Sequence, residues 1–254
     1  MRALFVLAVV LSLLVVGPAS PGEERRWKLA YAAETPGRSG LDVYVALVPG
    51  GKPRRVAGIA RRDDFSPTWS PDGRSIAFRR NPLRSDDGDI WVVPAAGGTA
   101  RNLTRSPGVA DWSPAWSPSG RRIAFFSTRA GGRDLWVMNA DGSRTQRLTR
   151  DAALNEYPSW SPDGRSIAFQ SHGTGEFEIV VVAADGRRRR NLSRNGADDK
   201  WPAWSPDGRW IAFVSTRAGG EDVFVMRTDG SGLRNLTRTR ALQESHPAWR
   251  PRAS

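Results

Sequence analysis

A polar side chain lies five positions before each of five regularly spaced tryptophans. The tryptophans are Trp69, Trp116, Trp160, Trp204 and Trp249, separated by 47, 44, 44 and 45 residues. The polar residues are Asp64, Asp111, Asn155, Asp199 and Glu244, and Glu156 adds a carboxylate beside Asn155. An aromatic ring or a histidine follows within two residues each time, at Phe65, Trp112, Tyr157, Trp201 and His246. If the repeats are related by rotation, these side chains gather at one channel mouth, where they could bind a cation or a basic peptide.

Two other interpretations of the same carboxylates stay open. In the first, each acid is structural and accepts backbone N–H bonds or pairs with an arginine such as Arg105, Arg150, Arg194 or Arg238, a common local role for Asp and Asn. In the second, two of the acids serve a glycoside hydrolase or lyase, which needs a pair of carboxylates about 5–10 Å apart. That pair would come from Asp64, Asp111, Glu156, Asp199 and Glu244.

The remaining residue types argue against catalysis. There is no cysteine, and the chain has no G-x-S-x-G nucleophile motif. The two histidines, His172 and His246, lie in different repeats without metal-ligand spacing. We therefore expect a protein that is not an enzyme and has no metal and no cofactor.

The elements that must position these side chains follow from the repeat. Each tryptophan belongs to a short apolar run, and three further runs follow it. Examples of the second, third and fourth runs are SIAF (75–78), DLWVM (134–138) and QRLT (146–149). Gly, Pro and Asp-Gly turns separate the runs, so each repeat reads as four strands. Four strands in a period of about 40–45 residues are the signature of a propeller blade.

The repeats predict an all-β fold, a β-propeller of about five four-stranded antiparallel blades. The blades are centred near residues 27–57 (with 246–251), 66–104, 113–149, 158–193 and 202–237. Residues 27–57 lack an innermost strand, and the run HPAWRP (246–251) matches one. We therefore expect the C-terminal strand to close the ring by joining the first blade, because closure removes exposed strand edges.

The two rims of such a propeller differ in their loops. The S-P-D-G turns and the A-D-G turns lie on one rim and are short and nearly identical. The loops on the opposite rim vary in sequence, and they include residues 81–89, 127–134, 171–178 and 215–222. Binding residues favour variable loops on a rigid scaffold, so this rim is where we expect a ligand.

The unit P-x-W-S-P-D-G-R-x-I-A-F, followed by D-[IL]-W-V-M-x-x-D-G-x-x-x-x-L-T, resembles the TolB-like propeller repeat. This repeat is a relative of the WD repeat, and the resemblance covers residues 27–254. It implies a propeller, and by analogy a role in an envelope complex of the periplasm. The sequence differs from the namesake in having five repeats where the namesake has six blades, and in leaving no room for its additional N-terminal domain. A similar repeat forms the non-catalytic propeller of prolyl-oligopeptidase-like enzymes, whose hydrolase domain has no counterpart here.

The ends and the charge of the chain indicate where it works. Arg2, the apolar run 3–16 and the small residues 17–20 have the form of a secretory signal peptide. We expect residues 1–19 to be that leader, 20–26 a short linker and 27–254 one propeller domain. An uncleaved membrane anchor is the alternative, although the run is shorter than the roughly 20 residues that a spanning helix needs. No transmembrane segment is expected after cleavage, and the location is then periplasmic or secreted.

The net charge of +12 favours an acidic partner. The partner that we expect is a protein or a cell-envelope polymer. An export signal makes nucleic acid an unexpected ligand, and we expect a monomer.

Overall fold

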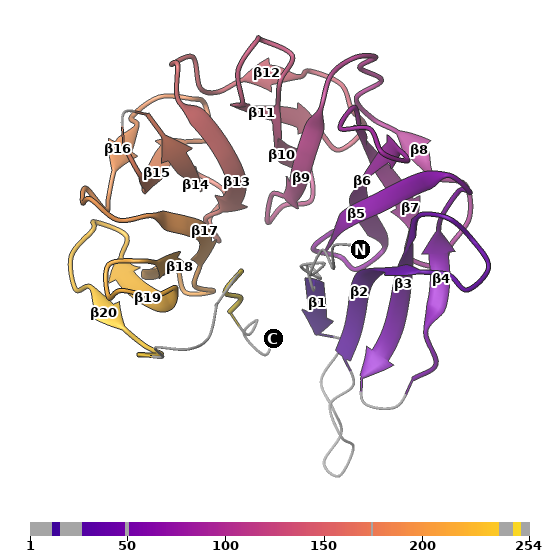
Figure 1. Cartoon of the computed structure of the whole chain (residues 1–254), viewed down its shortest axis with the longest axis horizontal. Helices are drawn as coiled ribbons and strands as arrows, with labels where there is room; N and C mark the ends of the chain where they lie inside the picture. Colours follow the sequence, from indigo (N-terminus) through magenta and orange to yellow (C-terminus); the bar gives the residue numbers. More distant parts are fainter. Residues whose placement is uncertain (1–11, 16–26, 49–50, 174, 239–245, 250–254) are drawn as a thin grey trace, which may run out of the picture.

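The computed structural model describes residues 12–15, 27–48, 51–173, 175–238 and 246–249. Regular secondary structure in these ranges is entirely β-strand, and none of the described residues forms a helix capable of crossing a membrane. The strands make five four-stranded antiparallel sheets that follow one another around a centre (Figure 1). The predicted all-β propeller of five four-stranded blades is confirmed.

The sheets follow the chain in order, and the labels below are those of Figure 1. The first contains β1 (Ser12–Val15), β2 (Trp27–Glu34), β3 (Leu41–Val48) and β4 (Arg54–Ala57). The second contains β5 (Arg62–Trp69), β6 (Ser75–Pro82), β7 (Asp89–Pro94) and β8 (Arg101–Asn102). The third contains β9 (Asp111–Trp116), β10 (Arg122–Ser127), β11 (Asp134–Asn139) and β12 (Gln146–Arg147).

The last two sheets repeat this plan. The fourth contains β13 (Leu154–Trp160), β14 (Ser166–His172), β15 (Phe177–Ala183) and β16 (Arg190–Asn191). The fifth contains β17 (Asp199–Trp204), β18 (Trp210–Ser215), β19 (Asp222–Arg227) and β20 (Arg234–Asn235). In the second to fifth sheets, the strand that ends in the repeat tryptophan (β5, β9, β13 or β17) lies nearest the centre of the ring (Figure 1).

The apolar core lies between neighbouring sheets. Ile123 and Phe125 of β10 pack with Ala77 and Ile90 of the preceding sheet, and all four are fully buried. Burying such side chains contributes about 1.5–3 kcal/mol each. The I-A-F triplet of each repeat therefore joins its blade to the one before it.

The S-P-D-G turns hold the inner strand to its neighbour as the sequence indicates. In the second blade Gly73 has a φ of 66°, and its N–H donates to Ser70 O at 2.9 Å. The Ser70 hydroxyl donates to Asp72 Oδ1 at 2.6 Å, and the backbone N–H of Arg74 donates to the same oxygen at 3.1 Å. The carboxylate thus fixes the turn from inside.

Ring closure differs from the expectation. The inner strand of the first sheet is β1, which pairs with β2 from Ser12↔Ala30 to Val15↔Trp27. The predicted closing strand, 246–251, is not seen as a strand in its described part, residues 246–249. The apolar run SLLV takes the free edge of β2, because an unpaired strand edge accepts any extended segment that can complete its hydrogen bonds.

The C-terminal segment nevertheless keeps the place of an inner strand beside the fifth blade. The indole N–H of Trp249 donates to Ala203 O of the fifth blade at 2.9 Å. In the same way, the indole N–H of Trp160 in the fourth blade donates to Ala115 O of the third blade at 3.0 Å. His246 has a φ of 48°, close to the 52° and 54° of the equivalent Tyr157 and Trp201. Part of the sequence predicted as a leader and part of the predicted closing strand thus compete for one position.

Candidate functional site

A β-bulge interrupts each of the inner strands β5, β9, β13 and β17. The pairing register shifts between Phe65 and Thr68, and at the same point in β9, β13 and β17. The residue three positions before each repeat tryptophan has a positive φ of 48–54°: Ser66, Ser113, Tyr157, Trp201 and His246. Bulges of this kind re-aim side chains, and left-handed non-glycine residues gather at functional sites.

The predicted acids do not stand open at the channel mouth. Asp64, Asp111 and Asp199 are fully buried, and each binds an arginine of its own blade. Arg80 donates from Nε and Nη2 to the two oxygens of Asp64 at 2.6 and 2.7 Å. Arg129 reaches Asp111 at 2.8 and 2.9 Å, and Arg217 reaches Asp199 at 2.9 and 2.7 Å.

The amide Asn155 holds the same place in the fourth blade. Its Oδ1 accepts from Ser171 Oγ at 2.8 Å, and its Nδ2 donates to Asp151 Oδ1 at 2.8 Å. Glu244 lies outside the described residues. The arginines that bind the acids come from the second strand of the blade or the loop after it, and not from the positions that the sequence suggested.

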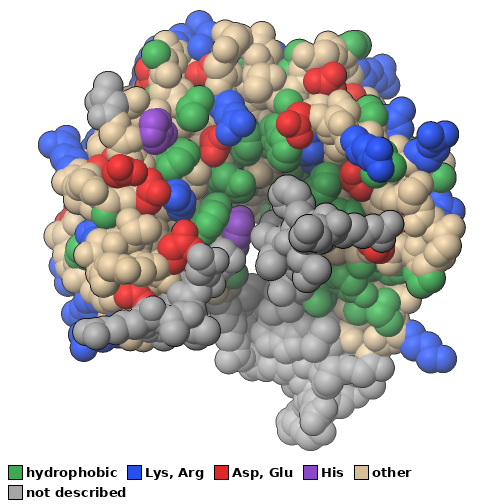
Figure 2. Space-filling model, in the orientation of Figure 1, with side chains coloured by type: hydrophobic (Ala, Val, Ile, Leu, Met, Phe, Trp, Pro, Cys, Tyr) green, Lys and Arg blue, Asp and Glu red, His purple; other side chains and the backbone are tan. Residues whose placement is uncertain are grey.

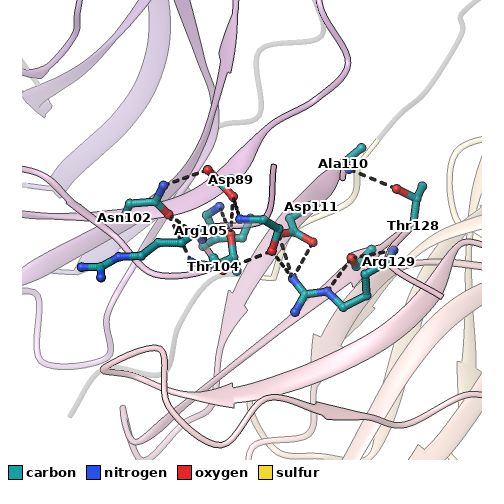
Figure 3. A network of polar contacts seen from close by, with 11 residues as sticks. Asp89, Asn102, Thr104, Arg105, Ala110, Asp111, Thr128 and Arg129 are labelled. Atoms are coloured by element: carbon teal, nitrogen blue, oxygen red, sulfur yellow. Dashed lines mark hydrogen bonds and ion pairs between the residues drawn. The ribbon is translucent and has the colours of Figure 1, made fainter. Parts of the chain in front are cut away.

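These ion pairs also tie consecutive blades together (Figure 3). Asp89, at the start of β7, accepts from Thr104 Oγ1 at 3.0 Å and from the backbone N–H of Ser106 at 2.8 Å. The hydroxyl of Ser106 accepts from Arg129 Nη2 at 3.2 Å, and Arg129 binds Asp111 of the next blade. A continuous polar chain therefore runs from the second blade into the third.

A guanidinium group occupies an equivalent position in four blades. It lies over the phenylalanine of the I-A-F triplet: Arg80 over Phe78 at 5.1 Å, Arg129 over Phe125 at 5.2 Å, Arg189 over Phe169 at 5.5 Å and Arg217 over Phe213 at 5.5 Å. In three of these blades the guanidinium also lies close to an aromatic ring of the third strand: Trp91, Trp136 and Phe224, at 4.8, 5.0 and 5.1 Å. The fourth blade has Val180 there.

The predicted aromatic side chains do come together. Tyr157 meets Trp201 edge-on at 6.4 Å and His246 at 5.7 Å, and Trp201 stacks on His246 at 4.5 Å. Phe126 continues the row, with Tyr157 at 5.7 Å and Trp112 at 6.1 Å. We call the set Phe65, Arg79, Trp112, Phe126, Tyr157, Trp201 and His246 the channel arc. Figure 2 shows hydrophobic side chains gathered around the hollow at the middle of this face, with Lys and Arg mainly toward its outer edge.

Two members of the channel arc were missed by the sequence reasoning. The guanidinium of Arg79 lies 3.3 Å from the ring centre of Trp112 and 5.9 Å from that of Phe65. Phe126 occupies the same strand position one blade later. The signal was present, because the residue after I-A-F changes in every repeat (Arg79, Phe126, Gln170, Val214) while the triplet itself is constant.

Burial sets the electrostatics of the channel arc. It lowers the pKa of Arg79 to about 10, although Asp86, Asp111 and Asp63 oppose the shift. It also raises the pKa of Tyr157, with the nearby Glu156 acting in the same direction, and it lowers the pKa of His246. Glu156 itself accepts from Arg133 at 2.5 Å and from Gln170 at 3.1 Å. At neutral pH the arc thus presents uncharged rings and one buried cation, and the neighbouring Glu156 is paired with Arg133.

One carboxylate departs from its symmetric partners. Burial raises the pKa of Asp64, with the Arg80 guanidinium opposing the shift. Its side chain has no exposed surface, and Arg80 holds both of its oxygens. A substrate has no path to it. In the described part of the chain, no three His, Asp or Glu side chains converge as metal ligands.

The inner-strand bulges, the S-P-D-G turns and the five four-stranded blades define a β-propeller. Residues 152–254 match the TolB beta propeller domain family. The resemblance that the repeats indicate is therefore confirmed.

Solved structures agree on the fold. A protein described as a TolB from Agrobacterium tumefaciens is 26% identical, with a TM-score of 0.69, and the match covers 82% of this chain and 76% of that one. TolB from Acinetobacter baumannii is 20% identical, with a TM-score of 0.71, and the match covers 89% of this chain but only 55% of that one. An oligogalacturonate lyase from Vibrio parahaemolyticus shares the fold at 12% identity and a TM-score of 0.63, covering 89% and 72%. A search of curated proteins found no match.

Proposed function

We propose that this chain is an exported, non-catalytic scaffold that binds a protein or a cell-envelope polymer at its variable rim and channel mouth. The observation that carries the proposal is the state of the channel-mouth side chains. The buried acids Asp64, Asp111 and Asp199 are bound to arginines, whereas the aromatic rings beside them are only partly buried. Such rings offer apolar contact area for recognition, since aromatic residues dominate binding interfaces.

A glycoside hydrolase or lyase is the weaker proposal. General acid catalysis needs a carboxyl group that reaches the substrate. Asp111 and Asp199 have no exposed surface and each holds a guanidinium, and Asp64 is equally enclosed. Glu156 is also buried, and Arg133 and Gln170 engage its oxygens. The lyase that shares this fold is only 12% identical and supports the fold alone.

The charge of the chain favours an acidic ligand. With a net charge of +12, the protein attracts acidic partners over a distance set by the ionic strength. The partly buried rings of the channel arc would then supply short-range contact, and the surrounding arginines would speed the encounter. The proposal thus joins an acidic protein or polymer to an apolar contact at the centre of the rim.

The test is capture of partners from an envelope extract by the exported chain. We expect the double variant Tyr157→Ala/Trp201→Ala to bind the captured partner at least about tenfold more weakly, since truncating central aromatic anchors costs 2 kcal/mol or more each. Trp210→Ala is the matched control, because this half-buried tryptophan follows the S-P-D-G turn on the opposite rim. It should retain the partner.

Thermal melting of all three proteins separates loss of binding from loss of folding. Equal affinity in the double variant and the wild type, with both folded, would show that the channel arc is not the binding surface. Turnover of an envelope polysaccharide by the wild type would replace the scaffold by the enzyme proposal.

A further inference from the structure

The fourth blade departs from the repeat at Gly173, Glu178 and Val180, and a pocket lies there. The pocket has a volume of about 800 Å³, within the range of small-molecule sites. Ser171, Gly173, Glu178, Val180 and Arg189 are among its lining residues. It opens on the variable rim, between the loops that precede β13, β15 and β17.

The sequence of the repeat explains why there is space at this place in the fourth blade. The loop sequence S-T-R places Arg129 and Arg217 in the third and fifth blades, but the fourth blade reads S-H-G and has Gly173 there. The third strand carries Trp136 and Phe224 in those blades but Val180 in the fourth. An arginine stem and an aromatic ring are therefore both missing from the fourth blade.

Arg189, from the fourth strand of the blade, fills the guanidinium position from the other side. It donates to Ser171 Oγ at 2.7 Å and to Asn155 Oδ1 at 3.4 Å, and it forms an ion pair with Asp151. The blade thus keeps its structural cation while the path used by Arg129 and Arg217 stays open from the rim. The pocket exists because Arg189 supplies this guanidinium in place of an arginine at position 173.

Glutamate in place of aspartate at the start of β15 leaves a donor unused. In the second and fifth blades the amides of Asn102 and Asn235 donate to Asp89 and Asp222 at 2.8 and 2.7 Å. The longer Glu178 instead accepts from Ser193 Oγ and from the backbone N–H of Asn195. The equivalent amide nitrogen, Asn191 Nδ2, makes no hydrogen bond within the described residues, and Asn191 lines the pocket.

The charge of the lining selects the ligand class. Asp151, Glu176 and Glu178 set three carboxylates against the single guanidinium of Arg189. An anion would have to displace Asp151 from Arg189 and face the other two carboxylates, and a cation would be placed beside a fixed guanidinium. A hydroxyl group both donates and accepts, so it can bond to carboxylate oxygens and to the free amide of Asn191 alike.

We propose that the fourth-blade pocket binds a neutral saccharide unit. Its hydroxyls would donate to the carboxylates of Glu176 and Glu178 and accept from Asn191 Nδ2, with Val180 as an apolar floor. This site is separate from the channel arc, so it goes beyond the proposed scaffold function and can succeed or fail independently of it.

The test refills the pocket with the residues of the neighbouring blades. The variant Gly173→Arg/Val180→Trp places the arginine and the tryptophan of the third blade at their equivalent positions in the fourth. Gly173 has no atom within 4 Å of an added Cβ and no left-handed backbone, so the arginine can be accommodated. A second variant, Asn191→Ala, removes the free donor without filling the pocket. It also removes Oδ1, which accepts from the backbone N–H groups of Ser193 and Arg194, so its thermal melting is compared with that of the wild type.

The probes are a glycan array carrying neutral and acidic saccharides, and a tetra-arginine peptide. We expect the wild type to bind neutral glycans with a Kd tighter than about 1 mM, the refilled variant to lose them, and Asn191→Ala to bind more weakly. Neither variant should change capture by the channel arc, which provides a folding control independent of thermal melting.

Three results would overturn the proposal. They are no neutral glycan bound by the wild type, equal neutral glycan binding by the wild type and the folded refilled variant, and a pocket-dependent preference for acidic glycans or for the basic peptide.

Discussion

At the residue scale, the buried acids pair with arginines, although with other arginines than those that the sequence suggested. The guanidinium of Arg129 forms an ion pair with Asp111 and lies close to the rings of Phe125 and Trp136. Both partners are buried or largely buried, so neither can exchange its partner for water at low cost. A buried ion pair need not add stability as a whole, but breaking one leaves an uncompensated charge.

We predict that Asp111→Ala lowers the free energy of unfolding by about 3 kcal/mol, because it strands the Arg129 guanidinium. The double variant Asp111→Ala/Arg129→Met should be more stable than the single variant, since it removes the stranded charge and keeps an apolar stem. Urea unfolding of the three chains checks this. A single variant as stable as the wild type would mean that water or another group compensates Arg129.

At the scale of the element, the aspartate of the S-P-D-G turn holds the turn between the first two strands of a blade by accepting hydrogen bonds. Three turns carry aspartate, but the third blade has Ser119 in its place. Its hydroxyl lies 3.2 Å from Ser117 Oγ and accepts from the Arg121 N–H at 3.4 Å, longer than the 2.6 and 3.1 Å contacts of Asp72. The hydrogen bond from Ser70 lowers the pKa of Asp72.

We predict that Ser119→Asp stabilises the chain by about 0.5 kcal/mol, and raises Tm by about 1–2 °C. The introduced carboxyl should have a folded-state pKa below its unfolded value of 3.8, as the equivalent Asp72 does. Its stabilisation is then complete above that unfolded value and disappears as the pH falls through the lower folded pKa. Melting at pH 7 and at about pH 2 checks both parts. Ser119→Asn is the control without charge, and an equal gain for it would exclude the carboxylate.

At the scale of the whole molecule, both ends of the chain take part in closing the ring. The edge of β2 pairs with β1, whereas Trp249 and His246 already hold an inner-strand position against the fifth blade. If residues 1–19 are removed as a leader, β1 goes with them. The segment after His246 would then be the nearest extended chain that can complete the first blade.

We predict that a chain of residues 20–254 unfolds in one cooperative transition and keeps the backbone amides of β2 protected from hydrogen exchange. A chain of residues 20–244 should lose that protection and melt lower, because the first blade would have no inner strand. Native-state hydrogen exchange on both chains, with the full-length chain as reference, decides it. Unprotected β2 amides in the 20–254 chain would show that the C-terminal segment does not close the ring.

The sequence by itself determined the fold. The tryptophan spacing, the I-A-F triplets and the Gly-containing turns are local signals that recur along the chain, so the number of blades and the strand order of the second to fifth blades followed from counting. The inner strand of the first blade did not, because it is β1 and not the predicted 246–251. The same local logic predicted that Tyr157, Trp201 and His246 would meet, because each holds an equivalent place in its repeat.

Tertiary structure decided how the side chains are used. No local rule says that Arg80, Arg129 and Arg217 reach the acids of their own blades, or that Arg189 fills the same position from a different strand, because such pairs join residues 16 to 34 positions apart. The space beside Val180 likewise depends on which neighbours fail to fill it. Packing is a sum over segments distant in the chain, so only the folded molecule shows which acids are occupied, which strand edge is taken and where a pocket remains.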